Sequence, residues 1–597
     1  MLQFDVVIID SGVDSSILNY PPSGICVEDN NGVFCYSDDL NDTSGHGTAI
    51  FSIISKNVDE QKIFVIKLAG LSDEPLDISL IEALKYVKEN IMCKVINISL
   101  GILYSDFLEE LYDLCYHINS RGTVIVSSFV NFGCYSYPAA FDCVVGVDNF
   151  DKIIDSKSYH FVANSPVNIL AKGRLQRVKS KNGNIFFLAG SSIACAHISS
   201  IICGSHLKEF SCTKVLSFLK SLSVQIWVNN IGDNASKKQL FDISNAAVFP
   251  FSKEEQAFLR FSSMLNFNIY GYYDVKYSGN VGKPLSAFYE NAPSTKFIKD
   301  INSIELSEID TIIIGHTDKL NDLTGCNYLK KLINMAIEKK INIVSFDSLA
   351  EYEDMLNSAG VKYYYPSITA CDVPQNSFGK LYKISRPVVG IFGTSSKQGK
   401  FSLQLSLKKE LEAEGYDVGA LGTEPHSLLF GFDSVFPMGY NSSVYIGNHE
   451  TVSYLNAKIN EMCMCGKDLV LVSSQAQFVP YYCNNLMEYP LLQYHFALGV
   501  KPDAIIMCIN YHDDIQYIQN TVYALMGLTD ASIIAFVMFP ITYNNDSFYG
   551  KKVMVSKTQF QSKETELHKA FNIPVYLLND EHINELCNTI IDTFSSR

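Results

Sequence analysis

The sequence has no surplus of positive charge, no long apolar run and no regular cysteine spacing. Its net charge of −16 disfavours polyanionic partners, so we expect no nucleic acid to bind. No apolar stretch approaches the roughly 18 residues that span a bilayer, and we expect no membrane span. The 16 cysteines follow no repeating pattern, which favours reduced thiols over a disulfide framework. The first residues lack a basic segment followed by an apolar core, so we expect a cytoplasmic protein.

The length and the apolar content of the chain predict several folded domains. The sequence has 597 residues, of which 47% are hydrophobic, and a chain of this length usually forms about two to four domains. Apolar strand-like runs alternate with helical stretches, which is typical of parallel α/β sheets. We predict an α/β chain of three domains, comprising residues 1–245, 246–384 and 385–597.

Three short segments carry the groups that a serine nucleophile requires. Asp10 ends an apolar run typical of a buried parallel strand, His46 stands between two glycines at the start of a helical stretch, and Ser192 opens another helical stretch. In such chemistry an imidazole takes the proton of the hydroxyl and a carboxylate orients the imidazole. A helix N-terminus also favours the negative charge that develops in acyl transfer. The segments therefore predict an Asp–His–Ser catalytic site.

In this order, the segments resemble the catalytic domain of the subtilases, which are serine peptidases. The resemblance covers residues 1–245. It implies that Asp10 orients His46 and that Ser192, activated by His46, attacks the peptide. Asn131 stands where the family has the asparagine that stabilises the oxyanion, a donor whose loss typically costs about 100- to 1000-fold in turnover. No cofactor is expected for this proteolysis.

The resemblance also assigns two segments to substrate binding. The predicted residues are Ser99, Leu100 and Gly101 at a strand edge, with Ser128, Phe129 and Val130 before the oxyanion asparagine. The family usually has Ala-Ala-Gly in the second segment, which forms a wall of the primary specificity pocket. Bulkier side chains at this wall narrow the pocket, so we expect a small residue such as Gly or Ala before the scissile bond.

Secreted subtilases normally carry an N-terminal prosegment that inhibits the enzyme, and this sequence has no room for one before its first catalytic strand. A cytoplasmic protease of this kind needs a narrow substrate range, a partner, or control by another part of its own chain. We expect the residues beyond 245 to provide this control.

A second motif lies in the C-terminal part of the chain. The apolar run 387–392 leads into a glycine-containing loop with two lysines and then into a helical stretch, which is the pattern of a phosphate-binding loop. The loop is one residue longer than the common Walker A form and resembles the variant of dethiobiotin-synthetase-like P-loop enzymes. The predicted nucleotide-binding residues are Gly393, Thr394, Ser395, Ser396, Lys397, Gln398, Gly399, Lys400, Phe401, Ser402 and Glu424.

The residues that would hold magnesium depart from the common pattern. Phe401 occupies the usual position of a Ser or Thr ligand, with Ser402 next to it. The later apolar run 468–472 is followed by Ser473 rather than by a carboxylate. Glu424 remains as an acidic candidate. We therefore expect ATP or GTP, with magnesium, to bind here and to be hydrolysed inefficiently, and we predict no other metal site.

Residues 246–384 have the pattern of a small open parallel sheet without an evident catalytic motif. His316 and Asp347 follow predicted strands, where they either line a ligand crevice or cap turns. Together with the P-loop part, this region resembles clostridial peptide-maturation proteins found beside small natural-product precursor genes, in which a Rossmann-like half precedes a P-loop half. Phe249–Ser252 and Gly422–Pro425 carry this resemblance with the P-loop.

The leading interpretation is a cytoplasmic serine endopeptidase that removes the leader of a ribosomally made peptide precursor. The C-terminal halves would recognise the precursor or gate its cleavage through nucleotide binding. One alternative makes the P-loop half a ligase or acyl transferase with an accessory protease domain. Another makes the chain a non-catalytic peptide-binding scaffold. The sequence leaves the oligomeric state open.

Overall fold

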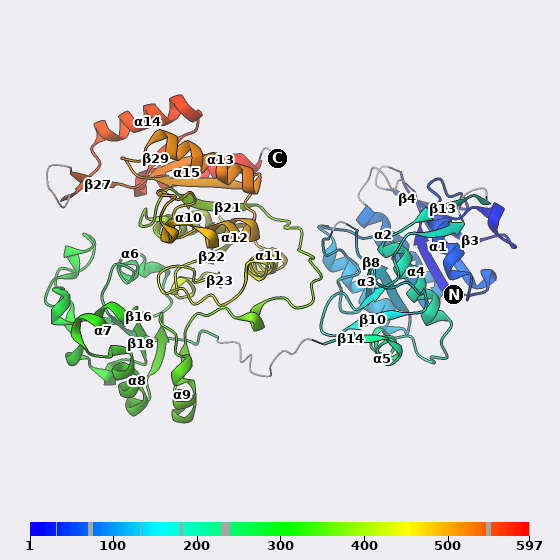
Figure 1. Ribbon diagram of the computed structural model, residues 1–597, viewed down its shortest axis with the longest axis horizontal. Helices are drawn as coiled ribbons and strands as arrows, with labels where there is room; N and C mark the ends of the chain where they lie inside the picture. The colour runs from blue at the N-terminus through cyan, green and yellow to red at the C-terminus, as the bar shows by residue number, and fades with distance from the viewer. Residues whose placement is uncertain are drawn as a thin grey trace. The chain divides into compact units, whose positions relative to one another are not determined.

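The computed structural model describes residues 1–30, 33–69, 76–131, 133–179, 183–228, 239–544 and 551–595. Helices alternate with mostly parallel strands (Figure 1), so the predicted α/β class is confirmed. The chain divides into two compact units. Unit 1 comprises residues 1–230 and 374–383, and unit 2 comprises residues 231–373 and 384–597. Among the described helices, none has both the length and the apolar character that crossing a membrane requires.

Unit 1 is built on a ten-stranded sheet with parallel central strands. The strand order is β14-β10-β11-β9-β8-β7-β2-β5-β3-β4. Helices cover both faces, which explains why the inner strands are apolar along their whole length. The bounds are β2 (Val6–Asp10), β3 (Ser23–Asn30), β4 (Val33–Ser37), β5 (Ile63–Leu68), β7 (Val95–Ile98), β8 (Val124–Ser128), β9 (Val145–Asn149), β10 (Tyr159–Val162), β11 (Ile169–Ala171) and β14 (Gln225–Trp227).

The helices of unit 1 divide between the two faces of this sheet. α2 and α3 pack against one face, whereas α1, α4 and α5 pack against the other. Their bounds are α1 (His46–Ile54), α2 (Leu76–Asn90), α3 (Leu108–Ser120), α4 (Ser191–Cys203) and α5 (Cys212–Leu222). Two small sheets complete the described part of the unit: β1 (Leu2–Gln3) with β6 (Ile91–Met92), and β12 (Gln176–Lys179) with β13 (Ile185–Leu188).

The ends of three neighbouring strands meet at one edge of this sheet. β2 pairs in parallel with β7, and β7 pairs in parallel with β8. Asp10 ends β2, Ser99 follows β7 and Ser128 ends β8. Because the carboxyl ends of parallel strands lie on the same side of a sheet, these predicted site residues share one edge.

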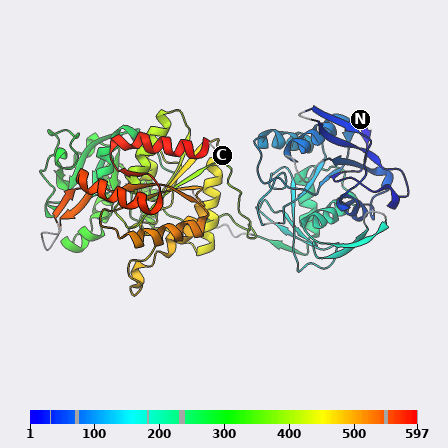
Figure 2. The same cartoon turned by 90° about the horizontal axis from the view of Figure 1, so that it is seen from above.

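Unit 2 contains two parallel sheets, with helices on both sides of the strands in Figure 2. The six-stranded sheet has the order β17-β16-β15-β18-β19-β20, with β15 (Asn245–Phe249), β16 (Asn268–Asp274), β17 (Lys299–Asp300), β18 (Thr311–Ile314), β19 (Asn342–Ser345) and β20 (Tyr363–Tyr364). The seven-stranded sheet has the order β23-β22-β24-β21-β25-β26-β29, with β21 (Val388–Gly393), β22 (Val418–Gly422), β23 (Ser434–Val435), β24 (Leu469–Ser473), β25 (Ala504–Ile509), β26 (Ser532–Met538) and β29 (Val575–Leu577). A hairpin, β27 (Ile541–Asn544) and β28 (Lys551–Met554), follows β26.

The two sheets of unit 2 share a hydrophobic core. Val248 and Phe346 from the six-stranded part lie in one cluster with Leu405, Ala420 and Phe430 from the seven-stranded part. The helices are α6 (Gln256–Arg260), α7 (Asp318–Thr324), α8 (Tyr328–Lys339), α9 (Glu353–Ala359), α10 (Lys400–Ala413), α11 (Asn448–Met464), α12 (Leu491–Val500), α13 (Ile515–Thr529), α14 (Lys557–Phe571) and α15 (Asp580–Ser595). The boundaries at 245 and 384 stay predictions.

Pro374–Lys383, which we call the strap, belongs to unit 1 although the residues on either side of it belong to unit 2. Tyr135 N donates to Leu381 O at 3.1 Å. Lys380 is 4% exposed, and its Nζ lies 2.8 Å from Asp148 Oδ2. The strap therefore contributes backbone pairing and a buried ion pair to the unit that contains the predicted catalytic residues.

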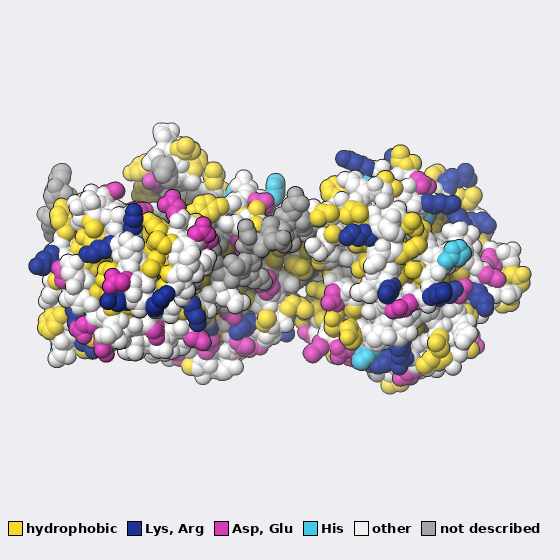
Figure 3. Space-filling view, turned by 90° about the horizontal axis from the view of Figure 1, so that it is seen from below, with side chains coloured by type: hydrophobic (Ala, Val, Ile, Leu, Met, Phe, Trp, Pro, Cys, Tyr) yellow, Lys and Arg dark blue, Asp and Glu magenta, His cyan; other side chains and the backbone are white. Residues whose placement is uncertain are grey.

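Charged side chains are distributed rather than concentrated on the face shown in Figure 3. Lys and Arg side chains lie there in small groups, with acidic, polar and apolar side chains between them.

Candidate active site

Asp10 and His46 form a hydrogen-bonded pair at the C-terminal end of β2. His46 Nδ1 lies 2.8 Å from Asp10 Oδ1, and Asp10 is 4% exposed. The negative charge of Asp10 raises the pKa of His46, while burial opposes this effect. Because the carboxylate engages Nδ1, Nε2 is left to exchange a proton with a nucleophile.

Two glycines explain how α1 brings His46 to this strand end. Gly45 precedes the helix with φ 81°, a left-handed conformation that favours glycine. A Cβ on Gly47 would lie only 2.2 Å from the carbonyl oxygen of Gly12. The lack of a side chain therefore lets α1 approach the segment that follows β2.

Asp42 holds the start of α1 and was not among the predicted site residues. It is 0% exposed and accepts hydrogen bonds from Gly45 N at 2.8 Å, Thr48 N at 2.8 Å and Thr48 Oγ1 at 2.6 Å. Burial alone would raise the pKa of Asp42, but these bonds lower it. Asp42 lies four residues before the helix start, outside the usual N-cap position, so no local pattern marked it.

Ser192 lies in the first turn of α4 and faces the end of β7. Its Oγ donates to the main-chain carbonyl of Ser99 at 3.1 Å. α1 and α4 contribute Ile50 and Ile193 to one core cluster, so the helices that carry His46 and Ser192 pack together. Among the described residues, no hydrogen bond joins Ser192 Oγ to His46. Catalytic hydrogen bonds are often made only when substrate is bound.

Asn131 lies against the N-terminus of α4. Its Oδ1 accepts hydrogen bonds from Ser191 N at 3.0 Å and from Ser191 Oγ at 3.1 Å. Nδ2 is thereby left as a donor. A Cβ on Gly190 would lie 2.9 Å from this amide, so glycine permits the close approach. The amide and the N-terminal N–H groups of α4 are the donor types that stabilise an oxyanion.

Val130 and Gly101 approach each other closely at the predicted specificity pocket. A Cβ on Gly101 would lie 2.9 Å from Val130 Cγ1 and 2.6 Å from Ser136 Oγ. Phe129 is 1% exposed, and its ring packs in an interior cluster with Tyr135. Val130 and Ser136, rather than the Phe129 ring, therefore fill the space beside Gly101. Ser136 was not among the predicted residues.

The other predicted substrate-binding residues lie at the same sheet edge. Ser99 and Ser128 are buried, and Leu100 is partly buried. Asn97 Nδ2 donates to Ser99 Oγ at 2.8 Å, which fixes that side chain and leaves its carbonyl for Ser192.

A hollow of about 690 Å³ lies beside Asn131 and Gly190. Its lining also contains Asp151 and Arg174, so a peptide in this hollow would meet one charge of each sign. The hollow therefore offers polar contacts next to the candidate oxyanion donor.

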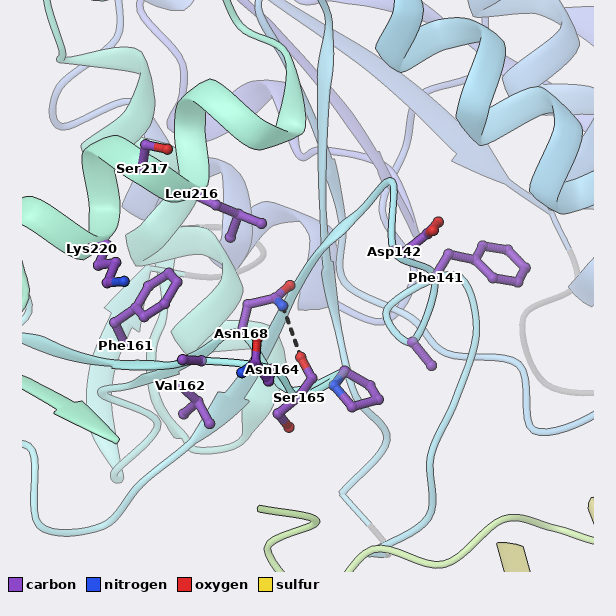
Figure 4. Close-up of a pocket in the computed structure, with 13 residues that line it drawn as sticks. Phe141, Asp142, Phe161, Val162, Asn164, Ser165, Asn168, Leu216, Ser217 and Lys220 are labelled. Atoms are coloured by element: carbon purple, nitrogen blue, oxygen red, sulfur yellow. Dashed lines mark hydrogen bonds between the residues drawn. The ribbon is translucent and has the colours of Figure 1, made fainter. Parts of the chain in front are cut away.

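Figure 4 shows a different hollow of about 440 Å³ in unit 1. Phe141, Phe161 and Lys220 contribute to its lining, and none of the predicted catalytic residues does. Asn168 Nδ2 donates to Ser165 O at 3.0 Å at its base. We assign this hollow no catalytic role.

The predicted phosphate-binding loop joins β21 to α10. Lys400 is 5% exposed, and its Nζ donates to Ser395 O at 2.7 Å across the loop. Burial lowers the pKa of Lys400 to about 8. Gln398 Oε1 accepts from Ser395 N at 3.1 Å, while its Nε2 donates to Thr394 Oγ1 at 2.6 Å. The loop thus folds around a buried amine, as a phosphate cradle requires.

The remaining loop residues differ in exposure: Gly393 is buried, Gly399 and Ser402 are partly buried, and Ser396 and Lys397 are exposed. Asp513, which sequence reasoning missed, accepts a hydrogen bond from Thr394 Oγ1 and another from Asn510 N at 2.7 Å. It lies after β25, far from the loop in sequence. No local motif marked it.

The position at which the common P-loop has a Ser or Thr ligand for magnesium is aromatic in this structure. The Phe401 ring lies 4.9 Å from His426 and 5.9 Å from Phe430, so an aromatic ring fills the usual position of the Ser or Thr ligand. Burial, with the charge of Glu254, raises the pKa of Glu424 to about 7. In the described ranges, no group of three or more His, Cys, Asp or Glu side chains could hold a metal ion.

Two family models match parts of the chain. Residues 4–205 match the Subtilase family, and residues 377–537 match a P-loop domain described as a domain of unknown function, DUF1611_C. These matches support a serine peptidase with a C-terminal P-loop module. A comparison with curated proteins finds no match.

Three solved structures resemble parts of the chain. A DUF1611 family protein from Anabaena variabilis is 11% identical, with 58% of this chain and 99% of that chain covered and a TM-score of 0.42. A cold-adapted subtilisin-like serine proteinase is 18% identical, with 36% and 81% covered and a TM-score of 0.29. The prenylagaramide maturation protease PagA is 21% identical, with 33% and 73% covered and a TM-score of 0.24.

Proposed function

We propose that the chain is a cytoplasmic serine endopeptidase that removes the leader from a ribosomally made natural-product precursor. The observation that carries this proposal is the Asp10–His46 pair, with Ser192 in the first turn of the neighbouring helix α4. The Subtilase match over residues 4–205 supports the peptidase class. The P-loop match supports a nucleotide-binding module that recognises the precursor or gates its cleavage.

In the proposed reaction, Ser192 Oγ loses its proton to His46 Nε2 and bonds to the carbonyl carbon of the substrate. Asp10 keeps Nδ1 protonated and stabilises the imidazolium. Asn131 Nδ2 and the N-terminus of α4 stabilise the oxyanion. His46 then gives the proton to the leaving amine. Water attacks the acyl-enzyme with His46 again as the base, which releases the acid and restores Ser192.

We further propose that the residue before the scissile bond is Gly or Ala. Val130 and Ser136 fill the space beside Gly101, so a larger substrate side chain would meet both. A rigid pocket discriminates between side chains mainly through such contacts.

The direct test is mass spectrometry of the precursor after incubation with the full chain, together with fluorophosphonate labelling of Ser192. We expect labelling and a cut after Gly or Ala, both lost in Ser192→Ala while the variant stays folded. Preferred cleavage after large aromatic residues would contradict the pocket assignment. An unlabelled Ser192 would favour the non-catalytic scaffold.

The strap connects the P-loop covalently to the unit that contains the proposed peptidase site, and the gating proposal uses this connection. Only residues 384–387 separate the strap from β21, which leads into the P-loop. Within the strap, the Lys380 ammonium lies 5.1 Å from the centroid of the Phe129 ring, and Phe129 directly precedes the wall residue Val130. A ligand at Lys400 that moves β21 therefore has a route to the specificity pocket.

Lys400→Ala tests this gating, with Lys409→Ala as the matched control because Lys409 is exposed on the same helix. We expect ATP or GTP to change the precursor cleavage rate of the wild-type chain and the control but not of Lys400→Ala. An identical nucleotide response in Lys400→Ala would remove the gating proposal and leave the peptidase proposal intact.

A further inference from the structure

A second histidine–carboxylate pair lies in unit 2, where β18 and β19 end. His316 Nδ1 lies 2.7 Å from Asp347 Oδ1, and both side chains are 10% exposed. Asp347 Oδ2 accepts from Thr317 N at 2.9 Å and from Thr317 Oγ1 at 3.1 Å. The carboxylate is thus held on both oxygens while it orients the imidazole. A carboxylate on Nδ1 is the contact that orients a histidine acting as a general base through Nε2.

Two glutamates that follow β15 lie next to this pair. Glu254 Oε2 lies 3.8 Å from His316 Nε2. Glu255 is 0% exposed, and its Oε1 has no hydrogen-bond partner among the described residues. A Cβ on Gly315 would lie 2.0 Å from this oxygen, so the carboxyl group is pressed against the residue before His316. A buried polar atom without a partner is costly, so the segment after β15 carries an unsatisfied carboxyl oxygen beside the histidine pair.

Glu424 connects the pair to the P-loop. It follows β22 on the seven-stranded side, and its pKa responds to the charges of Glu254, His316 and Lys400. The charges of these groups therefore act on one carboxyl group, although the groups come from both sheets of unit 2.

Aromatic contacts fix the two sheets at this point. The His426 ring stacks on Phe346 at 5.1 Å and meets Phe401 edge-on at 4.9 Å. Phe346 precedes Asp347, and Phe401 follows Lys400. The histidine pair and the P-loop lysine are therefore attached to one packed cluster, which positions them relative to each other.

The presence of a general base narrows the class of group that can receive the phosphoryl group. A carboxylate can attack a phosphoryl group without losing a proton, whereas a hydroxyl or an amine must lose one. An oriented histidine base beside a phosphate cradle therefore indicates a hydroxyl or amine nucleophile. Lys400 supplies the positive charge that the phosphate chain requires.

We propose that His316 and Asp347 are the general-base pair of a second catalytic centre, which transfers the terminal phosphoryl group of a nucleoside triphosphate to a hydroxyl or amine acceptor. His316 Nε2 takes the proton of the acceptor, whose oxygen or nitrogen bonds to the terminal phosphorus. The bond from that phosphorus to the bridging oxygen breaks, and the nucleoside diphosphate leaves. This inference rests on the proposed nucleotide site at Gly393–Lys400 and not on the peptidase.

The test uses the full chain carrying Ser192→Ala, so that peptide cleavage does not enter. Calorimetry measures binding of ATP and GTP with magnesium, and chromatography measures diphosphate release with water or added hydroxylamine as the acceptor. We expect His316→Gln to lower turnover by about 10²- to 10⁴-fold, which is the usual contribution of a general base, while nucleotide affinity is retained. Exposed His449 on α11 provides the matched control His449→Gln, which should keep both properties.

The outcomes separate the two proposals. Turnover that His316→Gln leaves unchanged, or binding without turnover with either acceptor, would overturn the second centre and leave the nucleotide site standing. Absence of nucleotide binding would overturn both. Lys400→Ala should lose binding and turnover together, whereas Lys409→Ala should lose neither.

Discussion

Each unit of this chain contains a histidine whose Nδ1 is hydrogen-bonded to a carboxylate at a strand end. The distances are nearly equal, at 2.8 Å for His46–Asp10 and 2.7 Å for His316–Asp347. The surroundings differ. The His46 side chain is 32% exposed and lies next to the helix that carries Ser192, whereas His316 is 10% exposed and lies among glutamates.

This comparison shows that a histidine–carboxylate pair defines a proton acceptor and not a reaction. In unit 1 the neighbours are a hydroxyl and an amide donor, which suit acyl transfer. In unit 2 the neighbours are glutamates, and the phosphoryl transfer proposed for this pair also needs the loop 393–400 from the other sheet. The groups around each pair therefore decide its chemistry.

Removing the carboxylate of one pair should separate the two chemistries most strongly. Asp10→Asn should lower kcat for peptide cleavage by about 10⁴-fold, because an amide favours the wrong tautomer of His46. The exposed Asp38→Asn is the matched control. In unit 2, Asp347→Asn should lower nucleotide turnover. An equal loss of peptide cleavage in Asp347→Asn would contradict the assignment of one chemistry to each pair.

Lys380→Met should destabilise unit 1 by about 3–5 kcal/mol, because it leaves the Asp148 carboxylate buried without its cation. Denaturant unfolding measures this effect. The double variant with Asp148→Asn should recover part of the loss, and exposed Lys383→Met should have little effect. A stability loss no larger than that of Lys383→Met would show that the strap is not part of the folded protease unit.

Asn131→Ala should lower kcat for peptide cleavage by about 100- to 1000-fold, with a much smaller change in KM. The Nδ2 donor acts on charge that develops only in the transition state. Steady-state kinetics with a peptide substrate would measure kcat and KM of Asn131→Ala and of the wild-type chain. An equal loss expressed mainly in KM would assign Asn131 to substrate binding.

Val130→Gly should raise cleavage after larger residues such as Leu, relative to Ala, by about 10- to 200-fold, because it removes one of the two side chains that fill the space beside Gly101. Phe129→Ala should instead lower the free energy of unfolding by about 3–5 kcal/mol, because that ring is interior. Cleavage rates for a series of peptides measure the change in specificity, and urea unfolding measures the change in stability. If Phe129→Ala alone widened the specificity, Phe129 rather than Val130 would form the wall of the pocket.

The pH dependence is the smallest expected effect. His46 must be neutral to accept a proton, and the charge of Asp10, with a lesser contribution from Asp42, raises its pKa above the ordinary 6.5. The kcat/KM for peptide cleavage should therefore fall as the pH decreases through a value above 6.5. Asp10→Asn should move this limb to lower pH. A wild-type limb below 6.5 would contradict the influence of Asp10.

Local motifs explain how much of the site could be predicted. A strand end at Asp10, a glycine-flanked helix start at His46 and a small-residue helix start at Ser192 are short patterns with local physical causes. The loop 393–400 is equally local. Asp42 and Asp513 had no such local signal, and the contact of Asp513 with Thr394 depends on the pairing of β21 with β25.

Side-chain direction could not be predicted from adjacency. Phe129 and Val130 follow each other in the sequence, yet one packs inward and the other faces Gly101. Which of two neighbours faces the pocket depends on how the segment leaves β8 and on what packs beneath it. The sequence of this segment does not show which of the two side chains faces the pocket.

The sequence by itself determined the α/β class, the order of the residues proposed for peptide cleavage and the place of the phosphate-binding loop, because each is written in a contiguous segment. Tertiary structure alone decided that Lys380 pairs with Asp148 and that His316 meets Asp347 from 31 residues away. Such contacts join ordinary polar residues that no local pattern marks. They exist only because parallel strands end side by side and the packed cores hold those ends together.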